Sequence, residues 1–176
     1  MADLFAVAPG SGAQELPPDW RERERALDIR QSWVVEAPAG SGKTGLLIQR
    51  YLKLLADESV EQPEQVLAIT FTVKATAEMR ERVREQLESA ALDNPVNDES
   101  AFALETRRLA RAVLERDALL GWRLLEHPRR LRIRTIDAVC GEIAHSLPVL
   151  SGGGGRQRPV EDATPMYREE IGRAHV

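Results

Sequence analysis

The hydrophobic positions of this chain alternate between short extended runs and longer segments with helical spacing. Trp33, Val34 and Val35 form a short apolar run, and a loop of small residues follows it. The segment after the loop has apolar residues three or four positions apart, at Leu47, Ile48, Tyr51, Leu52 and Leu55. The pattern predicts a strand, a loop and a helix, in that order.

A second extended run, Val66 to Ile69, follows a polar stretch in which Pro63 ends the helical pattern. The run is too short and too rich in β-branched residues for a helix, so we expect a buried strand. Strand, helix and strand in succession predict a parallel βαβ unit. The next helix is expected to begin at a Thr72 cap, and its buried face carries Ala75, Met79, Val83 and Leu87.

Helical spacing returns at Ser100 and continues to about residue 130, with Phe102, Leu109 and Val113 on the buried side. Gly121 and Pro128 are expected to divide this region into two helices. The run 131–136 then alternates apolar residues with Arg132 and Arg134, which predicts a third strand. A helix is expected from Asp137 to Leu147. The region 92–130 therefore reads as a helical insertion between sheet elements.

The remaining boundaries follow from composition. Residues 1–18 are rich in small residues and proline and predict a flexible tail, and Asp19 is expected to cap a short helix that follows it. We expect residues 19–91 to form the first part of one α/β domain and residues 131–150 to return to it. Residues 151–169 contain SGGGG and predict a linker and the start of another helix.

Composition and charge limit the classes of protein to consider. With 176 residues, of which 43% are hydrophobic, the chain can bury one core with a smaller helical lobe. The net charge of -4 argues against a wholly basic nucleic-acid binder. Residues 103–134, however, contain nine arginines against four acids. Such a cluster fits a solvated helix face or a surface that follows phosphates, and both interpretations remain open.

The single cysteine, Cys140, excludes an intramolecular disulfide and favours a reducing compartment, where we expect it to be a buried small apolar residue. No apolar run approaches the roughly 18 residues of a membrane span, and the first thirty residues lack the pattern of a signal peptide. We expect a cytoplasmic protein without a membrane partner.

The loop APAGSGKT has the spacing of a phosphate-binding loop, with alanine where the first glycine usually stands. Successive backbone N–H groups and the positive end of the following helix can surround a phosphate. Lys43 is expected to contact the β- and γ-phosphates, and the Thr44 hydroxyl to hold Mg²⁺. We therefore expect ATP and Mg²⁺ as cofactors and Lys43 and Thr44 as catalytic residues. The nucleotide-binding residues are Ala37, Pro38, Ala39, Gly40, Ser41, Gly42, Lys43 and Thr44.

Three blocks resemble the first motifs of UvrD/Rep-type superfamily 1 DNA helicases, nearest to their AddA- and RecB-like helicase-nuclease branch. They are APAGSGKT at 37–44, ITFTVKATAEMRERV at 69–83 and RIRTIDAVCGEI at 132–143. The second block is the narrow signal, because many unrelated proteins share the phosphate loop. The resemblance implies an α/β fold: a RecA-like P-loop NTPase domain with a parallel sheet, helices on both faces and a 1B-like insertion, here incomplete.

The resemblance also implies function: ATP-driven movement along single-stranded DNA, usually 3′ to 5′, in DNA repair and recombination, with a helicase-nuclease partner subunit. It assigns two segments to single-stranded DNA, and the residues are Thr70, Phe71, Thr72, Lys74, Ala75, Thr135 and Asp137. Stacking of a base on Phe71 and polar contacts to the backbone fit such binding without sequence preference. Phe71 also fits a core aromatic, and Thr135 and Asp137 also fit helix caps.

Two features depart from the family pattern. The upstream helix often carries a glutamine that reads adenine, and Arg23 stands at the aligned position, so the resemblance assigns Arg23 to nucleotide binding. Hydrolysis also needs an acidic pair after a strand, and neither Asp57-Glu58 nor Asp98-Glu99 follows an apolar run. We therefore expect this chain to lack ATPase activity. The alternative function is another P-loop protein, either a small-molecule kinase or a nucleotide-binding module.

The last seven residues, 170–176, can be encoded by GAG ATC GGA AGA GCA CAC GTC. After its first two bases this DNA reads as a common sequencing-library adapter. We therefore expect the natural sequence to stop near Glu169 and the segment 170–176 to be an artefact of the reading.

Overall fold

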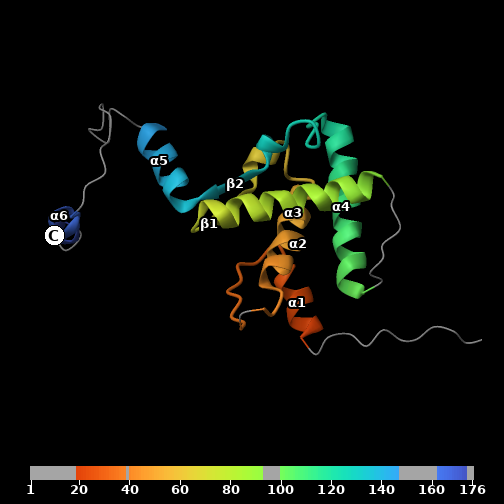
Figure 1. Ribbon diagram of the computed structural model, residues 1–176, viewed down its shortest axis with the longest axis horizontal. Helices are drawn as coiled ribbons and strands as arrows, with labels where there is room; N and C mark the ends of the chain where they lie inside the picture. Colours follow the sequence, from red (N-terminus) through yellow and green to blue (C-terminus); the bar gives the residue numbers. More distant parts are fainter. Residues whose placement is uncertain (1–18, 39, 93–99, 147–161, 174–176) are drawn as a thin grey trace, which may run out of the picture. The chain divides into compact units, whose positions relative to one another are not determined.

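The computed structural model describes residues 19–38, 40–92, 100–146 and 162–173. The chain forms two compact units, residues 1–136 and residues 137–176. Figure 1 shows the first unit as three longer helices beside a small sheet, with a short helix before them. Its elements are α1 (Trp20–Ala26), α2 (Lys43–Leu55), η1 (Pro63–Gln65), β1 (Leu67–Thr70), α3 (Val73–Ala91), α4 (Ala101–Leu120), η2 (Pro128–Arg130) and β2 (Arg132–Thr135).

The sheet consists of β1 and β2, which pair in parallel. Leu67 lies opposite Arg132, and the register continues to Thr70 opposite Thr135. Both strands were predicted from their apolar runs, and each forms within one residue of the predicted start. Because α3 and α4 lie between them in the sequence, two segments that are distant in the chain meet at one sheet.

The strand predicted at Trp33–Val35 does not form. Residues 33–38 have no regular secondary structure, and the Val34 side chain is 97% exposed. A short apolar run becomes a strand only when a neighbour takes its backbone hydrogen bonds. Within the described residues β1 and β2 pair only with each other, so the run has no such neighbour.

The helices of the first unit cover one face of the sheet. Ile133 is fully buried and Ala68 packs against the core, whereas Leu67 and Ile69 are exposed. The register places Arg132 and Arg134 beside these two apolar residues, and guanidinium groups favour contact with water. The expectations of a fully buried β1 and of helices on both faces are therefore wrong for the part of the chain that the structure describes.

The core lies between α2, α3, α4 and the covered sheet face. In Figure 1, α3 runs across α2 and α4, and all three helices contribute buried residues. Met79, Val83 and Leu87 of α3 are buried, as predicted from their spacing, and Leu109 and Val113 of α4 are buried as well. The region predicted as an insertion therefore contributes to the same core as the helix that follows the phosphate loop.

The second helix expected between Gly121 and Pro128 does not form. Gly121 ends α4 with a φ of 65°, which glycine adopts without strain. Trp122 then turns into the core, where it is 1% exposed and its Nε1 donates to Glu61 O at 2.9 Å. Because this anchored side chain redirects the backbone, residues 122–127 pass over the core without helical structure.

The second unit contains α5 (Ile136–Ser146), apart from its first residue, and α6 (Thr164–Arg173). The helix expected from Asp137 is thus present as α5. Cys140 is exposed, which corrects the expectation of burial, because no residue of α5 is buried. No described helix is both long and apolar enough to cross a membrane. The predicted tail 1–18, the SGGGG linker and residues 174–176 lie outside the described residues, and α6 includes positions 170–173.

Candidate nucleotide site and DNA-facing loop

The phosphate-loop sequence leads directly into α2, as predicted. Gly42 occupies the N-cap position with a φ of 81°, and Gly40 has a φ of 79°. Both values lie in the left-handed region that favours glycine. Lys43 and Thr44 are the first two residues of the helix, where backbone N–H groups have no partner within the helix. The loop therefore presents its last residues at a positive helix end.

Lys43 is held by the loop itself. Its Nζ donates to Ala37 O at 2.6 Å and also to the carbonyl of Pro38. These two carbonyls belong to the residues that open the predicted phosphate loop, so the ammonium group bridges the beginning and the end of that loop. Thr44 is exposed in the first turn of α2. Ala39 lies outside the described residues.

Arg23 of α1 also contacts the loop. Its Nη2 donates to Ser41 O at 2.7 Å, and its Nε donates to Asp19 Oδ2 at 2.9 Å. The Arg23 guanidinium lowers the pKa of Asp19, chiefly through this side-chain hydrogen bond. Asp19 occupies the N-cap position of α1, but its side chain makes no capping hydrogen bond, because Arg23 takes the carboxylate. Asp19 therefore occupies the predicted N-cap position, but the capping hydrogen bond expected of its side chain does not form.

A pocket of about 430 Å³ opens between α1, the segment 33–37 and the start of α2. Trp33 forms part of its wall and is fixed by two contacts: Nε1 donates to Asp28 O at 3.0 Å, and the Arg25 guanidinium lies 5.5 Å from the ring centroid. Pockets of about 300–1,000 Å³ suit small ligands. The volume, the Lys43 ammonium and the buried Ser41 Oγ, which has no hydrogen-bond partner among the described residues, fit a nucleotide phosphate chain.

The described residues contain no group of three His, Cys, Asp or Glu side chains that could hold a metal ion. Mg²⁺ often keeps several waters and uses few protein ligands together with substrate phosphates. The exposed Thr44 hydroxyl fits one such position. The remaining ligands would come from the nucleotide and from water.

Two supporting contacts were not predicted from the sequence. Arg50 of α2 donates to Ala26 O, Asp28 O and Gln31 O at 2.5, 2.9 and 2.8 Å, and this fixes the turn after α1. Arg50 sits among the apolar residues of α2, and an arginine at such a position is the only sequence signal for this role.

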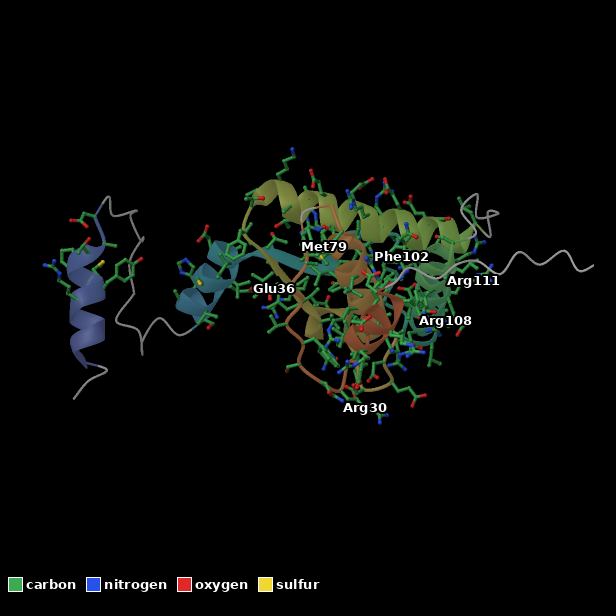
Figure 2. The ribbon with its side chains drawn as sticks, turned by 90° about the horizontal axis from the view of Figure 1, so that it is seen from below. Arg30, Glu36, Met79, Phe102, Arg108 and Arg111 are labelled. Atoms are coloured by element: carbon green, nitrogen blue, oxygen red, sulfur yellow. The ribbon has the colours of Figure 1, made fainter. Side chains whose placement is uncertain are left out.

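Gly45 provides the second contact, where α4 approaches α2. A Cβ atom at Gly45 would lie 2.6 Å from Phe102 Cζ, and Gln49 Nε2 donates to Phe102 O at 3.0 Å. Figure 2 labels Phe102, which lies among the helices of the first unit. The helix that follows the phosphate loop therefore packs against the start of α4, one residue beyond Thr44.

The junction between β1 and α3 presents the first predicted DNA-facing segment. Phe71 is 86% exposed, which excludes the alternative of a core aromatic in this structure. The hydroxyls of Thr70 and Thr72 have structural partners: Thr70 Oγ1 lies 2.6 Å from Thr76 Oγ1, and Thr72 Oγ1 accepts from Ala75 N at 3.0 Å. These bonds fix the backbone on both sides of Phe71, so its ring projects from an ordered turn.

The other predicted DNA-binding residues are placed as follows. The Lys74 side chain is exposed, and its Nζ lies 3.9 Å from Glu78 Oε1. Ala75 is half-buried in the first turn of α3. Thr135 lies opposite Thr70 in the sheet register, so the two threonines share the carboxyl edge, where ligands of α/β sheets bind. Asp137 is exposed in the first turn of α5 and belongs to the second unit.

A glycine loop before a helix and a polar carboxyl edge of a parallel sheet are typical of nucleotide-binding α/β proteins. Comparison with known families is more specific. The model of the UvrD/REP helicase N-terminal domain matches residues 20–163, and the chain belongs to this family. The resemblance seen in the three sequence blocks is thereby confirmed.

Several relatives carry related names. The chain is 33% identical over 129 residues to the AddA subunit of the ATP-dependent helicase/nuclease of Desulfitobacterium hafniense, and the match covers 72% of this chain and 8% of that protein. It is 43% identical over 94 residues to the RecB subunit of the RecBCD enzyme of Mycolicibacterium smegmatis, covering 51% of this chain and 9% of the relative. The chain thus spans less than a tenth of the length of these curated relatives. No solved structure matches the chain.

Proposed function

We propose that this chain is the N-terminal ATP- and single-stranded-DNA-binding part of an ATP-dependent DNA helicase that acts in repair and recombination and moves 3′ to 5′. Membership of the UvrD/REP helicase family supports the class. The observation that carries the nucleotide assignment is the glycine loop at the start of α2, where Gly40 and Gly42 are left-handed and Lys43 and Thr44 begin the helix.

In this proposal the phosphate chain of ATP binds at the N-terminus of α2. The unpaired N–H groups of the first turn contact phosphate oxygens, and the helix dipole favours their negative charge. Lys43 exchanges the carbonyls of Ala37 and Pro38 for the β- and γ-phosphates, since an ammonium–phosphate contact is stronger than one with a neutral carbonyl. The Thr44 hydroxyl contributes a ligand to Mg²⁺.

Single-stranded DNA binds, in the same proposal, along the carboxyl edge of the sheet. The exposed Phe71 ring offers a stacking surface for one base, and the exposed Lys74 ammonium in the first turn of α3 offers a contact for a phosphate. Thr135 lies at the same edge of the sheet, and the sequence resemblance assigns Asp137 to DNA binding as well. The relatives are named as subunits of a helicase/nuclease and of the RecBCD enzyme, and these names support the further proposal that the complete protein works with a nuclease partner.

The test of the nucleotide assignment is calorimetry with Mg²⁺-ATP on the purified chain and on Lys43→Ala. We expect the parent to bind and the variant to lose most of its affinity, because the ammonium contact to the phosphates is removed. Lys53→Ala is the matched control, since it removes the same charge from the last turn of the same helix. Equal affinity of parent and Lys43→Ala, with both proteins folded by circular dichroism, would refute the assignment.

A further inference from the structure

We infer that Arg23 positions the phosphate loop instead of reading the base, so that this site selects nucleoside triphosphates by their phosphates and discriminates little between ATP and GTP. The inference rests on the proposed nucleotide site and specifies its substrate class. Arg23 stands at the position where related helicases often carry the adenine-reading glutamine.

The contacts of Arg23 point at the loop. Nη2 donates to Ser41 O at 2.7 Å, and the Cβ that any other residue would carry at Gly42 would lie 3.3 Å from Nη1. The guanidinium therefore lies against the two residues that precede Lys43. Its side chain is only 20% exposed, so it is held between α1 and the loop.

Asp19 fixes the guanidinium in this orientation. Its Oδ2 accepts from Nε at 2.9 Å and lies 2.8 Å from Nη2, one helical turn before Arg23. A carboxylate that binds two nitrogens of one guanidinium sets the plane of the group as well as its position. The carbonyl of Ser41 is consequently held by a donor that α1 orients.

The chemistry of the side chain also argues against adenine recognition. A glutamine amide offers an NH₂ donor group and a carbonyl acceptor, which match N7 and N6 of adenine. A guanidinium offers only donors, and the base edge that suits two donors is O6 and N7 of guanine. Here the Nε and Nη2 donors already bind Asp19 and Ser41, so neither purine is favoured strongly.

The hydrogen bond from Arg23 to Ser41 O also constrains the backbone of the phosphate loop. Gly40 and Gly42 have positive φ values, and Ser41 between them is the residue whose carbonyl Arg23 holds. The Ser41 carbonyl and the Gly42 N–H belong to one planar peptide group, so anchoring the carbonyl also fixes the direction of this N–H. Loss of the anchor should therefore weaken every ligand that binds through a triphosphate, whatever its base.

The experiment measures binding of Mg²⁺-ATP, Mg²⁺-GTP and inorganic triphosphate to the purified chain by calorimetry. Arg23→Met keeps the apolar stem and removes the donors, and Asp19→Asn weakens the anchor while leaving the guanidinium. Arg21→Met is the matched control, because it removes one charge from the same helix at a position that does not line the pocket.

We expect the parent to bind ATP and GTP within about threefold of each other. Arg23→Met should weaken all three ligands by a similar factor of about tenfold, since a charged hydrogen bond contributes about that much. Asp19→Asn should act in the same direction with a smaller factor, and Arg21→Met should leave all three affinities unchanged. Arg23→Lys, which retains the positive charge and an ammonium donor group, should recover part of the loss.

Amide hydrogen exchange separates positioning from general destabilisation. Without nucleotide, Arg23→Met should speed exchange in the loop peptide 40–46 and leave the buried α3 peptide 79–90 unchanged. A loss confined to ATP, an unchanged affinity for all three ligands, or equal acceleration of both peptides would overturn the inference. If Arg23→Met does not fold, Asp19→Asn is judged by the same criteria. If the parent binds ATP and Lys43→Ala does not, these outcomes leave the proposed nucleotide site standing.

Discussion

At the residue scale, the arginines of this protein have different tasks although the sequence presents them as one cluster. Arg116 donates to Val60 O at 2.5 Å and lies 5.9 Å from the Trp122 ring centroid. Arg130 donates to Glu64 Oε1 at 2.7 Å and to Trp122 O at 2.9 Å, and its guanidinium lowers the pKa of Glu64. Both side chains join α4 and its following turn to the segment before β1. They therefore serve the fold, and a surface that follows phosphates would have to use other arginines.

Phe71 is the residue on which the DNA proposal depends most directly. Phe71→Ala should weaken binding of an oligothymidylate about fivefold or more, because one base–aromatic stack contributes about 1–3 kcal/mol. Fluorescence anisotropy with a labelled oligonucleotide at low salt measures this change. Val73→Ala is the control, since Val73 is likewise exposed, two residues further on, but offers no ring for stacking.

Two outcomes would contradict a stacking role for Phe71. If Phe71→Ala and Val73→Ala bind the oligonucleotide as tightly as the parent, the exposed ring is not a stacking surface. If both lose affinity to the same degree, the effect arises from the shape of the β1–α3 turn and not from stacking.

At the element scale, α2, α3 and α4 could be predicted from the sequence because each carries its buried face in its own spacing. Thr72 caps α3 as predicted, and Ser100, where a helical region was expected to begin, caps α4 through a bond from Ala103 N at 3.2 Å. The candidate strand at Trp33–Val35 could not be predicted in the same way. An apolar run specifies a strand only with a partner, and the partner is a property of the tertiary fold.

The same reasoning explains which parts of the candidate site were predictable. The glycine loop and its lysine follow from local spacing, since the conformation of Gly40 and Gly42 is a local property. The contacts of Arg23 and Phe102 join α1 and α4 to the loop and to α2 across 18 and 53 sequence positions. No local sequence pattern predicts contacts between residues that are so far apart in the chain.

Gly45 allows α2 and α4 to approach each other closely. The interaction energy between positions 45 and 102 can be measured with a double-mutant cycle. Alanine in a helix interior is normally more stable than glycine by about 1 kcal/mol. At Gly45 the new Cβ would lie 2.6 Å from Phe102 Cζ, and overpacking costs about 1–3 kcal/mol. We therefore expect Gly45→Ala to destabilise the parent but to stabilise a Phe102→Ala background.

Urea unfolding of the four proteins in this cycle gives the coupling energy. Gly141→Ala is the matched control, because nothing lies within 4 Å of a Cβ at Gly141 in α5 and only the helix propensity changes there. If Gly45→Ala has the same effect with and without the Phe102 ring, the close packing of α2 on α4 is not present in solution.

At the scale of the whole molecule, the described residues contain the loop that we propose binds nucleotide phosphates, but no Asp-Glu pair that follows either described strand. The Asp57 carboxylate accepts hydrogen bonds from Ser59, which lower its pKa, and the Asp57–Glu58 pair follows α2 and not a strand. The other Asp-Glu pair, Asp98–Glu99, lies outside the described residues. A bound ATP would thus meet Lys43 and Thr44 without a neighbouring carboxylate pair from the described strands.

We therefore predict that the 176-residue chain binds ATP but hydrolyses it no faster than the background, with or without single-stranded DNA. Transition-state stabilisation in phosphoryl transfer depends on a positioned water and on cations around the γ-phosphate, and binding alone lowers no barrier. Phosphate release from the purified chain, with Lys43→Ala to report contaminating activity, measures this directly. Turnover that DNA stimulates and that Lys43→Ala abolishes would show that the acidic and cationic groups for hydrolysis are supplied within these residues.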